Sequence, residues 1–210
     1  MNAAEHTLAS IIIGIALATC GSMCGDAHAQ PIDAARLERA LRVAVSVGAP
    51  ERVPVAHCRH AGPRMPSGLG RWARCERRLA RFATYFERAG RTQHVSAWTL
   101  AAMALRESGL NPWAQGPAGE GGVMQLHPRG IGAHEPFVRS ERYRRQCRHA
   151  VGACQWPIVL AGARHLARWI ARCGSESSAL GGYNRGRCGE TAYSRGVAST
   201  RARLRASAND

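Results

Sequence analysis

The chain of 210 residues contains no lysine and few acids: all 29 basic residues are arginine, against 14 aspartates and glutamates. The formal net charge is therefore +15, which indicates a polyanionic neighbourhood such as a cell wall, anionic lipid headgroups or nucleic acid. The arginines are scattered along the chain instead of lining one recognition helix, and no nucleic-acid-binding motif is present. We therefore expect no nucleic acid as the partner.

The N-terminal apolar run, Leu8–Cys20, is too short to span a bilayer comfortably. Small residues follow it and end in Ala27–Ala29, an A-x-A cleavage pattern, so we expect a mature chain that starts at Gln30. The usual positive n-region is missing, because the first seven residues contain Glu5 and no arginine. A lipoprotein signal ending at Cys20 fits less well, since threonine precedes the cysteine, and an uncleaved anchor is a further alternative. The sequence thus predicts export to the periplasm.

The cysteines support export. Of the eight cysteines, two precede the proposed cleavage site and six remain, and an even number in an exported chain is typical of disulfides. A lipidated Cys20 would leave an odd number. We expect three local closures, Cys58–Cys75, Cys147–Cys154 and Cys173–Cys188. The chain has no C-x-x-C and its histidines show no recognised ligand spacing, so we expect no metal site.

Apolar residues at helical spacing predict four helices. The expected helices are Asp33–Val47, Arg71–Ala89, one that starts at Ala97, and Trp156–Cys173. Gly90 is expected to end the second of them. The segment Pro54–Gly70 is rich in proline and glycine and indicates a loop or linker, and we expect the basic tail from Arg201 to be frayed.

One acid occupies an unusual place in this pattern. Ser96 can cap the helix that starts beside it, and Gly109 with Pro112 ends that helix, so Glu107 falls in its last turn. The carbonyl end of a helix is negative and disfavours a carboxylate. An acid there, next to apolar residues, tends to keep its proton, as a general acid must. Its position alone also allows an ordinary solvated glutamate.

Three motifs follow one another from this acid onward. They are E-S-G-L-N-P-W-A at Glu107–Ala114, G-V-M-Q-L-H-P at Gly122–Pro128 and G-Y-N-R-G at Gly182–Gly186. Together they resemble the E-S-G-x-x-P-x-A, G-x-x-G-L-M-Q-L-x-P and A-Y-N-x-G signatures of the soluble lytic transglycosylases, a lysozyme-like family. The resemblance covers Leu79–Leu204. It implies a mainly α, goose-lysozyme-like domain, here with a short N-terminal extension and disulfides, that needs no cofactor.

The resemblance also implies a reaction in which Glu107 acts twice. It would first protonate the glycosidic oxygen between N-acetylmuramic acid (MurNAc) and N-acetylglucosamine (GlcNAc). It would then take the proton of the muramoyl C6 hydroxyl, which attacks C1 and gives a 1,6-anhydro sugar. An intramolecular nucleophile needs no second base and gains from proximity. The single well-placed acid agrees with this chemistry, whereas ordinary glycoside hydrolases need two carboxylates.

The family pattern assigns contacts around this acid. Ser108 would support the glutamate or the substrate. Met124 and Gln125 would face the cleft, the glutamine as a hydrogen-bonding contact to an acetamido or hydroxyl group. Tyr183 would place its hydroxyl near the sugar, and Asn184 would fix the turn that presents the tyrosine.

Four positions depart from the pattern. Gly116 and Glu120 stand where relatives usually have serine and alanine. Glu120 could serve with Glu107 as a second carboxylate for lysozyme-type hydrolysis, but we expect it to point to solvent, as most loop acids do. His127, where relatives often have methionine, is expected to be structural. Tyr193 comes one residue early for the family's closing E-T-x-x-Y, so its place in the site stays open.

The sequence therefore predicts a signal peptide at 1–29, an N-terminal helix and linker at 30–70, the lysozyme-like domain at 71–205 and a tail at 206–210. The expected partner is the glycan strand of peptidoglycan. By analogy alone, an envelope-spanning secretion or conjugation apparatus is a second expected partner. A non-catalytic wall-binding or assembly protein with the same fold is the alternative of another class, and the intact Glu107 favours the enzyme.

Overall fold

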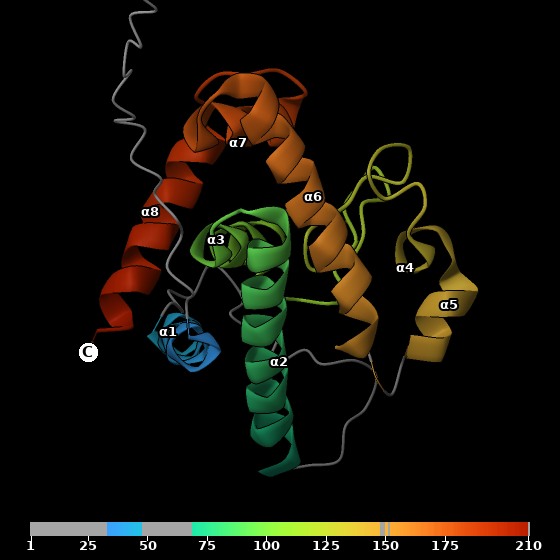
Figure 1. Ribbon diagram of the computed structural model, residues 1–210. Coiled ribbons are helices and arrows are strands. Elements are labelled where there is room, and N and C mark those ends of the chain that lie inside the picture. Colours follow the sequence, from blue (N-terminus) through green and yellow to red (C-terminus); the bar gives the residue numbers. More distant parts are fainter. Residues whose placement is uncertain (1–32, 48–68, 148–149, 151, 210) are drawn as a thin grey trace, which may run out of the picture.

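The computed structural model describes residues 33–47, 69–147, 150 and 152–209 (Figure 1). The expected leader at 1–29, Cys58 and the side chain of Cys75 lie outside the described residues. Within the described part the structure is mainly helical, with isolated antiparallel bridges of Gly121 to Gln115 and to Leu126, which confirms the predicted fold class. None of the helices in these residues is long and apolar enough to cross a membrane.

The helices enclose one central helix. They are α1 (Ala34–Val47), α2 (Leu69–Gln93), α3 (Ala97–Ser108), α4 (Pro136–Arg139), α5 (Glu141–Gln146), α6 (Trp156–Cys173), α7 (Glu176–Arg185) and α8 (Ala192–Ser207), with a short 3-10 helix at Ala153–Gln155. In Figure 1, α3 lies between α8 on one side and α6 on the other. It packs against α2, α6 and α8, while α1 packs against α2 and α8.

The central helix α3 is buried because it is apolar on all sides. Residues 97–104 are all at most 5% exposed, and their several alanines allow neighbouring helices to approach closely. Ser96 caps the helix by accepting a hydrogen bond from the Thr99 amide, and Gly109, in a left-handed conformation with φ 59°, ends it. Glu107 therefore lies in the last turn, where the helix leaves the core.

The glycine expected to end α2 does not do so. The helix continues through Gly90 to Gln93, so that expectation was wrong. A Cβ at this position would lie 2.7 Å from the carbonyl oxygen of Val95 and 3.1 Å from the amide nitrogen of Ala97. The glycine does not end α2; it lets the backbone at the start of α3 pack closely against this helix.

The C-terminal helix is also longer and better fixed than the sequence indicated. α8 runs to Ser207, with Leu204 only 1% exposed. Arg201 forms an ion pair with Glu176 of α7 and donates to the hydroxyl of buried Thr99 in α3. The expectation of a frayed tail from Arg201 was wrong, because this arginine and the buried leucine join α8 to the core.

Of the three expected cysteine pairs, the two that lie wholly within the described residues are bonded. Cys147 pairs with Cys154, with a Cα–Cα distance of 6.1 Å, and Cys173 pairs with Cys188, with a Cα–Cα distance of 5.5 Å. The first closes the connection between α5 and α6. The second joins the end of α6 to the segment before α8. Both therefore restrain chain segments at the two ends of α6.

Candidate active site

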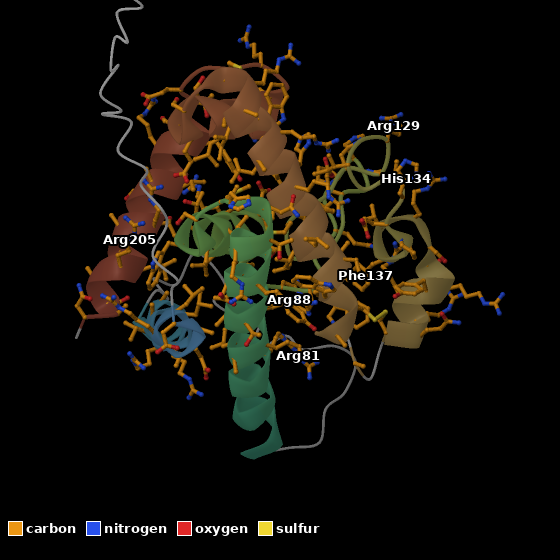
Figure 2. All side chains as sticks on the ribbon, in the orientation of Figure 1. Arg81, Arg88, Arg129, His134, Phe137 and Arg205 are labelled. Atoms are coloured by element: carbon orange, nitrogen blue, oxygen red, sulfur yellow. A yellow bond between two sulfur atoms is a disulfide. The ribbon has the colours of Figure 1, made fainter. Side chains whose placement is uncertain are left out.

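A cleft of about 820 Å³ opens at the end of α3. Its walls come from the last turn of α3, the loop of residues 116–135, one face of α6 and the end of α7. In Figure 2 this loop, on which Arg129 and His134 are labelled, lies beside α6. Arg205 on α8 lies on the opposite side of the molecule. The residues assigned from sequence divide into two groups. Those that line the cleft are Glu107, Glu120, Gln125, Tyr183 and Asn184, and those that do not are Ser108 and Met124.

Glu107 is half-buried and lines this cleft. Burial raises the pKa of its carboxyl above the ordinary value, and the charge of Glu120 acts in the same direction. A hydrogen bond from Tyr193 and the charge of Arg106 oppose this increase but do not cancel it. The acid is thus set to hold its proton at a higher pH than a solvated glutamate would.

Tyr193 is the residue of the site that sequence reasoning left open. Its hydroxyl donates to Glu107 Oε1 at 2.6 Å. Thr191 caps α8 through a reciprocal capping box with Ser194, which places Tyr193 in the first turn, facing the acid. Burial and the neighbouring Glu107 raise the pKa of the Tyr193 hydroxyl, so it stays a donor. The preceding Glu190-Thr191 pair was the signal that could have identified it.

This contact distinguishes the two oxygens of the acid. Since Tyr193 donates to Oε1, we assign the proton of the neutral carboxyl to Oε2. Oε2 is then the oxygen that can donate to, and later accept from, a bound substrate. The geometry fits a group that alternates between acid and base, because the tyrosine bond persists in both protonation states.

The hydroxyl of Ser108 bonds to backbone carbonyl oxygens and not to the carboxyl of Glu107. Its hydroxyl lies 2.9 Å from the carbonyl oxygen of Val123 and 3.1 Å from that of Ala104. It therefore joins the end of α3 to the loop that forms the other wall of the cleft. Ser108 was expected to support the acid or the substrate, but in the structure it supports the loop.

The side chain of Met124 lies in the core, contrary to expectation. It is fully buried and packs on Gly162 of α6, where a Cβ would lie 3.0 Å from the methionine Cε. The absence of a side chain at position 162 creates the space that the methionine fills. Only the backbone of Met124 reaches the site, since its carbonyl oxygen accepts a hydrogen bond from the Tyr183 hydroxyl at 3.3 Å.

Gln125 lines the cleft and also shapes the loop. Its amide nitrogen donates to the carbonyl oxygens of Ala114, at 3.0 Å, and Gly122, at 2.9 Å. The residue itself has a positive φ of 46°, a conformation that costs free energy for a residue with a side chain. Buried Gln155 accepts from the Val123 amide at 2.9 Å. These bonds hold the loop in the shape that presents Gln125.

Glu120 faces the cleft, which corrects the expectation that it points to solvent. It is half-buried, and its Oε2 accepts from the Ala118 amide at 3.0 Å. A Cβ at Gly116 would lie only 2.3 Å from this oxygen. The two departures from the family pattern are therefore coupled, because the glycine at 116 provides the space for the carboxylate of Glu120.

The third motif is helical, not a turn as expected. Tyr183 and Asn184 lie in the last turn of α7, which ends at Gly186 with φ 72°. Gly182 packs on the Trp169 ring, where a Cβ would lie 2.3 Å from a ring atom. Helix packing therefore presents Tyr183 to the cleft, while Asn184 is exposed at its margin.

The α6 wall supplies polar residues that the sequence did not single out. Arg164, His165 and Arg168 line the cleft, as do His134 and Glu135. No motif marked these residues. The signal was the spacing of Arg168 from Arg164 (i, i+4) and from His165 (i, i+3) in an amphipathic helix. Among the described residues, no group of three histidines, cysteines or acids could hold a metal ion.

The comparison with protein families decides what kind of domain carries this cleft. The family model of the transglycosylase SLT domain matches residues 84–204, more than half of the chain. The chain belongs to the transglycosylase SLT domain family. Neither curated proteins nor solved structures give a significant match. Membership makes the domain lysozyme-like and supports lysis of peptidoglycan of the lytic transglycosylase type.

The helical unit extends beyond the matched SLT segment. α1 precedes that segment, yet Leu37, Ala40 and Leu41 are fully buried against α2 and α8. The SLT domain of this chain thus has a core to which an N-terminal helix contributes.

His127, inside the matched segment, lines the cleft while its Nδ1 accepts from the Arg129 amide at 3.1 Å.

Proposed function

We propose that the protein is a peptidoglycan lytic transglycosylase that cleaves the β-1,4 bond between MurNAc and GlcNAc and forms a 1,6-anhydro-muramoyl end. The setting of Glu107 is the observation that carries this proposal. It is a cleft-facing carboxyl at the end of a buried helix, with a raised pKa and with one oxygen bonded to Tyr193. Family membership supports the substrate.

In the first step, Oε2–H of Glu107 protonates the glycosidic oxygen. The bond from that oxygen to muramoyl C1 breaks, GlcNAc leaves with a free C4 hydroxyl, and positive charge develops at C1. Tyr193 then donates to a carboxylate instead of a neutral acid, a stronger hydrogen bond. The raised pKa of Glu107 favours this step because a larger share of the carboxyl is protonated at a given pH than in a solvated glutamate.

In the second step, the muramoyl C6 hydroxyl attacks C1 and its proton passes to Oε2 of Glu107. The acid regains its starting state, and the product carries the anhydro bridge. Both reacting groups belong to one sugar, so the step gains from proximity and needs no bound water. One carboxyl thus suffices for the whole reaction.

The position of Glu120 supports a second candidate, hydrolysis of the lysozyme type. This residue faces the same cleft as Glu107, and its negative charge raises the pKa of that acid. A second carboxylate could activate a water molecule, which would attack C1 in place of the C6 hydroxyl. The products would then have reducing muramoyl ends.

Mass spectrometry of the soluble products from purified peptidoglycan distinguishes these reactions. We expect anhydromuramoyl products from the unmodified protein and a loss of about a thousandfold in Glu107→Gln, which keeps the shape but cannot transfer the proton. Glu141→Gln, at an exposed position of α5, is the control and should retain activity. Reducing ends that depend on Glu120 would establish hydrolysis, and wall binding without products would establish a non-catalytic protein.

We also propose that the chain acts after export to the periplasm, by itself or beside a secretion or conjugation apparatus. The A-x-A pattern before Gln30 and the two bonded cysteine pairs support export. Sequencing the N-terminus of the protein from a periplasmic fraction should find Gln30. An intact leader on a cytoplasmic protein would contradict export, and no crosslinks to an envelope complex would contradict the second partner.

A further inference from the structure

The α6 wall of the cleft carries donors that the proposed mechanism does not use. Arg164, His165 and Arg168 occupy one face of α6 and line the cleft together. Arginine side chains only donate hydrogen bonds, and so this wall is rich in donors and positive charge. The acid Glu107 and the loop acid Glu120 line the same cleft from α3 and the loop. The α6 wall thus adds basic groups to a cleft that also holds acids.

The protonation of His165 follows from its neighbours. Trp169 Nε1 donates to His165 Nε2 at 3.0 Å, and the rings of His165 and Tyr183 meet edge-on with centroids 5.3 Å apart. An indole N–H can only donate, so we assign Nε2 as the unprotonated nitrogen and Nδ1 as the one that carries hydrogen. Burial, and then the charge of Arg168, lower the pKa of His165 to about 4. The ring is thus neutral at neutral pH, with a fixed Nδ1–H.

This Nδ1–H faces a second donor. Arg168 Nη2 lies 3.4 Å from His165 Nδ1, and neither group can accept from the other in this tautomer. Among the described residues Arg168 forms no ion pair. Arg164 differs, because its charge acts on Glu135 and opposes the burial that raises the pKa of that acid. Two adjacent donors without a shared acceptor favour a bound anionic oxygen.

We propose that Arg168 and the Nδ1–H of His165 form a subsite for a carboxylate carried by the muramoyl side chain of the glycan strand. This inference rests on the proposed function, which supplies the substrate class. The sugar rings of the strand are uncharged, and its negative charge comes from the lactyl group of MurNAc or from the peptide attached to it. A guanidinium binds a carboxylate through two parallel hydrogen bonds, which gives orientation as well as affinity. The subsite therefore selects strands by their acidic side chains.

Binding to the uncleaving Glu107→Gln protein tests this subsite. Titration calorimetry would compare a peptide-bearing glycan fragment, the same fragment with its peptides removed, and a chitin oligosaccharide of equal length. We expect Arg168→Gln to weaken binding of at least one acidic fragment about tenfold and to leave the chitin oligosaccharide within twofold. Loss with the peptide-bearing fragment alone assigns a peptide carboxylate. Loss with the peptide-free fragment alone assigns the free lactyl carboxylate, which is an amide when the peptide is attached, and loss with both means that the subsite accepts either carboxylate.

Matched variants separate the subsite from general charge. Arg205→Gln removes the same charge from α8, on the opposite side of the molecule (Figure 2), and should change no affinity. Arg168→Lys keeps the charge without the planar fork and should recover part of the loss. Salt should weaken binding of the acidic fragments to the parent protein more than that of chitin.

Unchanged affinities in Arg168→Gln, or equal weakening for all three ligands in a variant whose circular dichroism matches the parent, would overturn the subsite. Failure of the proposed function has a different signature. It would appear as the absence of anhydromuramoyl products from the unmodified protein, whatever the binding series gives. The two ideas can therefore fail separately.

Discussion

The two sides of the cleft are built differently. On one side, Glu107 and Tyr193 project from α3 and α8, whose packing surfaces are buried, and a 2.6 Å hydrogen bond joins them. On the other, Glu120 and Gln125 project from a loop whose shape depends on its own backbone and side-chain hydrogen bonds. The helical side fixes the acid, while the loop side adjusts its surroundings. Substitutions on the helical side should therefore have large effects on stability and activity. Substitutions on the loop side should have smaller effects, mainly through the electrostatics of the acid.

The largest difference should appear in stability. Leu204→Ala removes a side chain that is 1% exposed in α8, and we expect the free energy of unfolding to fall by about 3 kcal/mol. Ile131→Ala, a truncation of similar size in the half-buried loop wall, should cost about 1 kcal/mol or less. Urea unfolding followed by circular dichroism measures both. Equal losses would show that the loop is packed as tightly as the helices.

The next effect concerns catalysis on the helical side. Tyr193→Phe removes the hydroxyl that stabilises the carboxylate of Glu107. We expect kcat to fall roughly tenfold to a hundredfold and the pKa of Glu107 to rise. Because the reaction starts from the protonated acid, the alkaline limb of the kcat/KM profile should move to higher pH. A pH series with Tyr143→Phe as control measures this, and a limb that moves to lower pH would contradict the assigned contact.

Glu120→Gln should give a smaller shift of the opposite sign. The negative charge of Glu120 raises the pKa of Glu107, so removing that charge lowers the pKa and moves the alkaline limb to lower pH. For a transglycosylase we expect kcat to change only about twofold to threefold at neutral pH. The same pH series measures both variants. Complete loss of activity would instead indicate that Glu120 takes part in hydrolysis.

Four helices of the fold, α1, α2, α3 and α6, could be predicted because their signals are local. The cap at Ser96 and the stop at Gly109 define α3, and the apolar spacing of α6 gives its bounds, Trp156–Cys173. Short sequence separations also gave the two bonded cysteine pairs. The family motifs singled out Glu107 as the candidate acid, since they combine residue identity with order along the chain, and the structure places this residue in the cleft.

What could not be predicted depends on contacts between distant residues. The burial of Met124 requires a glycine at position 162 of α6, and the extension of α2 past Gly90 requires the close approach of α3. The contact between Tyr193 and Glu107 joins residues 86 positions apart. Periodicity describes one element at a time, so it gives no signal for a space that another element creates or fills.

The smallest expected effect tests the coupling between Gly116 and Glu120. In Gly116→Ala the new methyl group would overlap the Glu120 carboxylate, and the flexible end of that side chain can move away at little cost in stability. We expect the unfolding free energy to change by less than about 1 kcal/mol and the alkaline limb to move the same way as in Glu120→Gln. The double variant should then shift the limb no further than Glu120→Gln alone, because both changes act through one carboxylate. Additive shifts would mean that residue 116 affects the acid independently, and that the glycine and the glutamate depart from the family pattern for separate reasons.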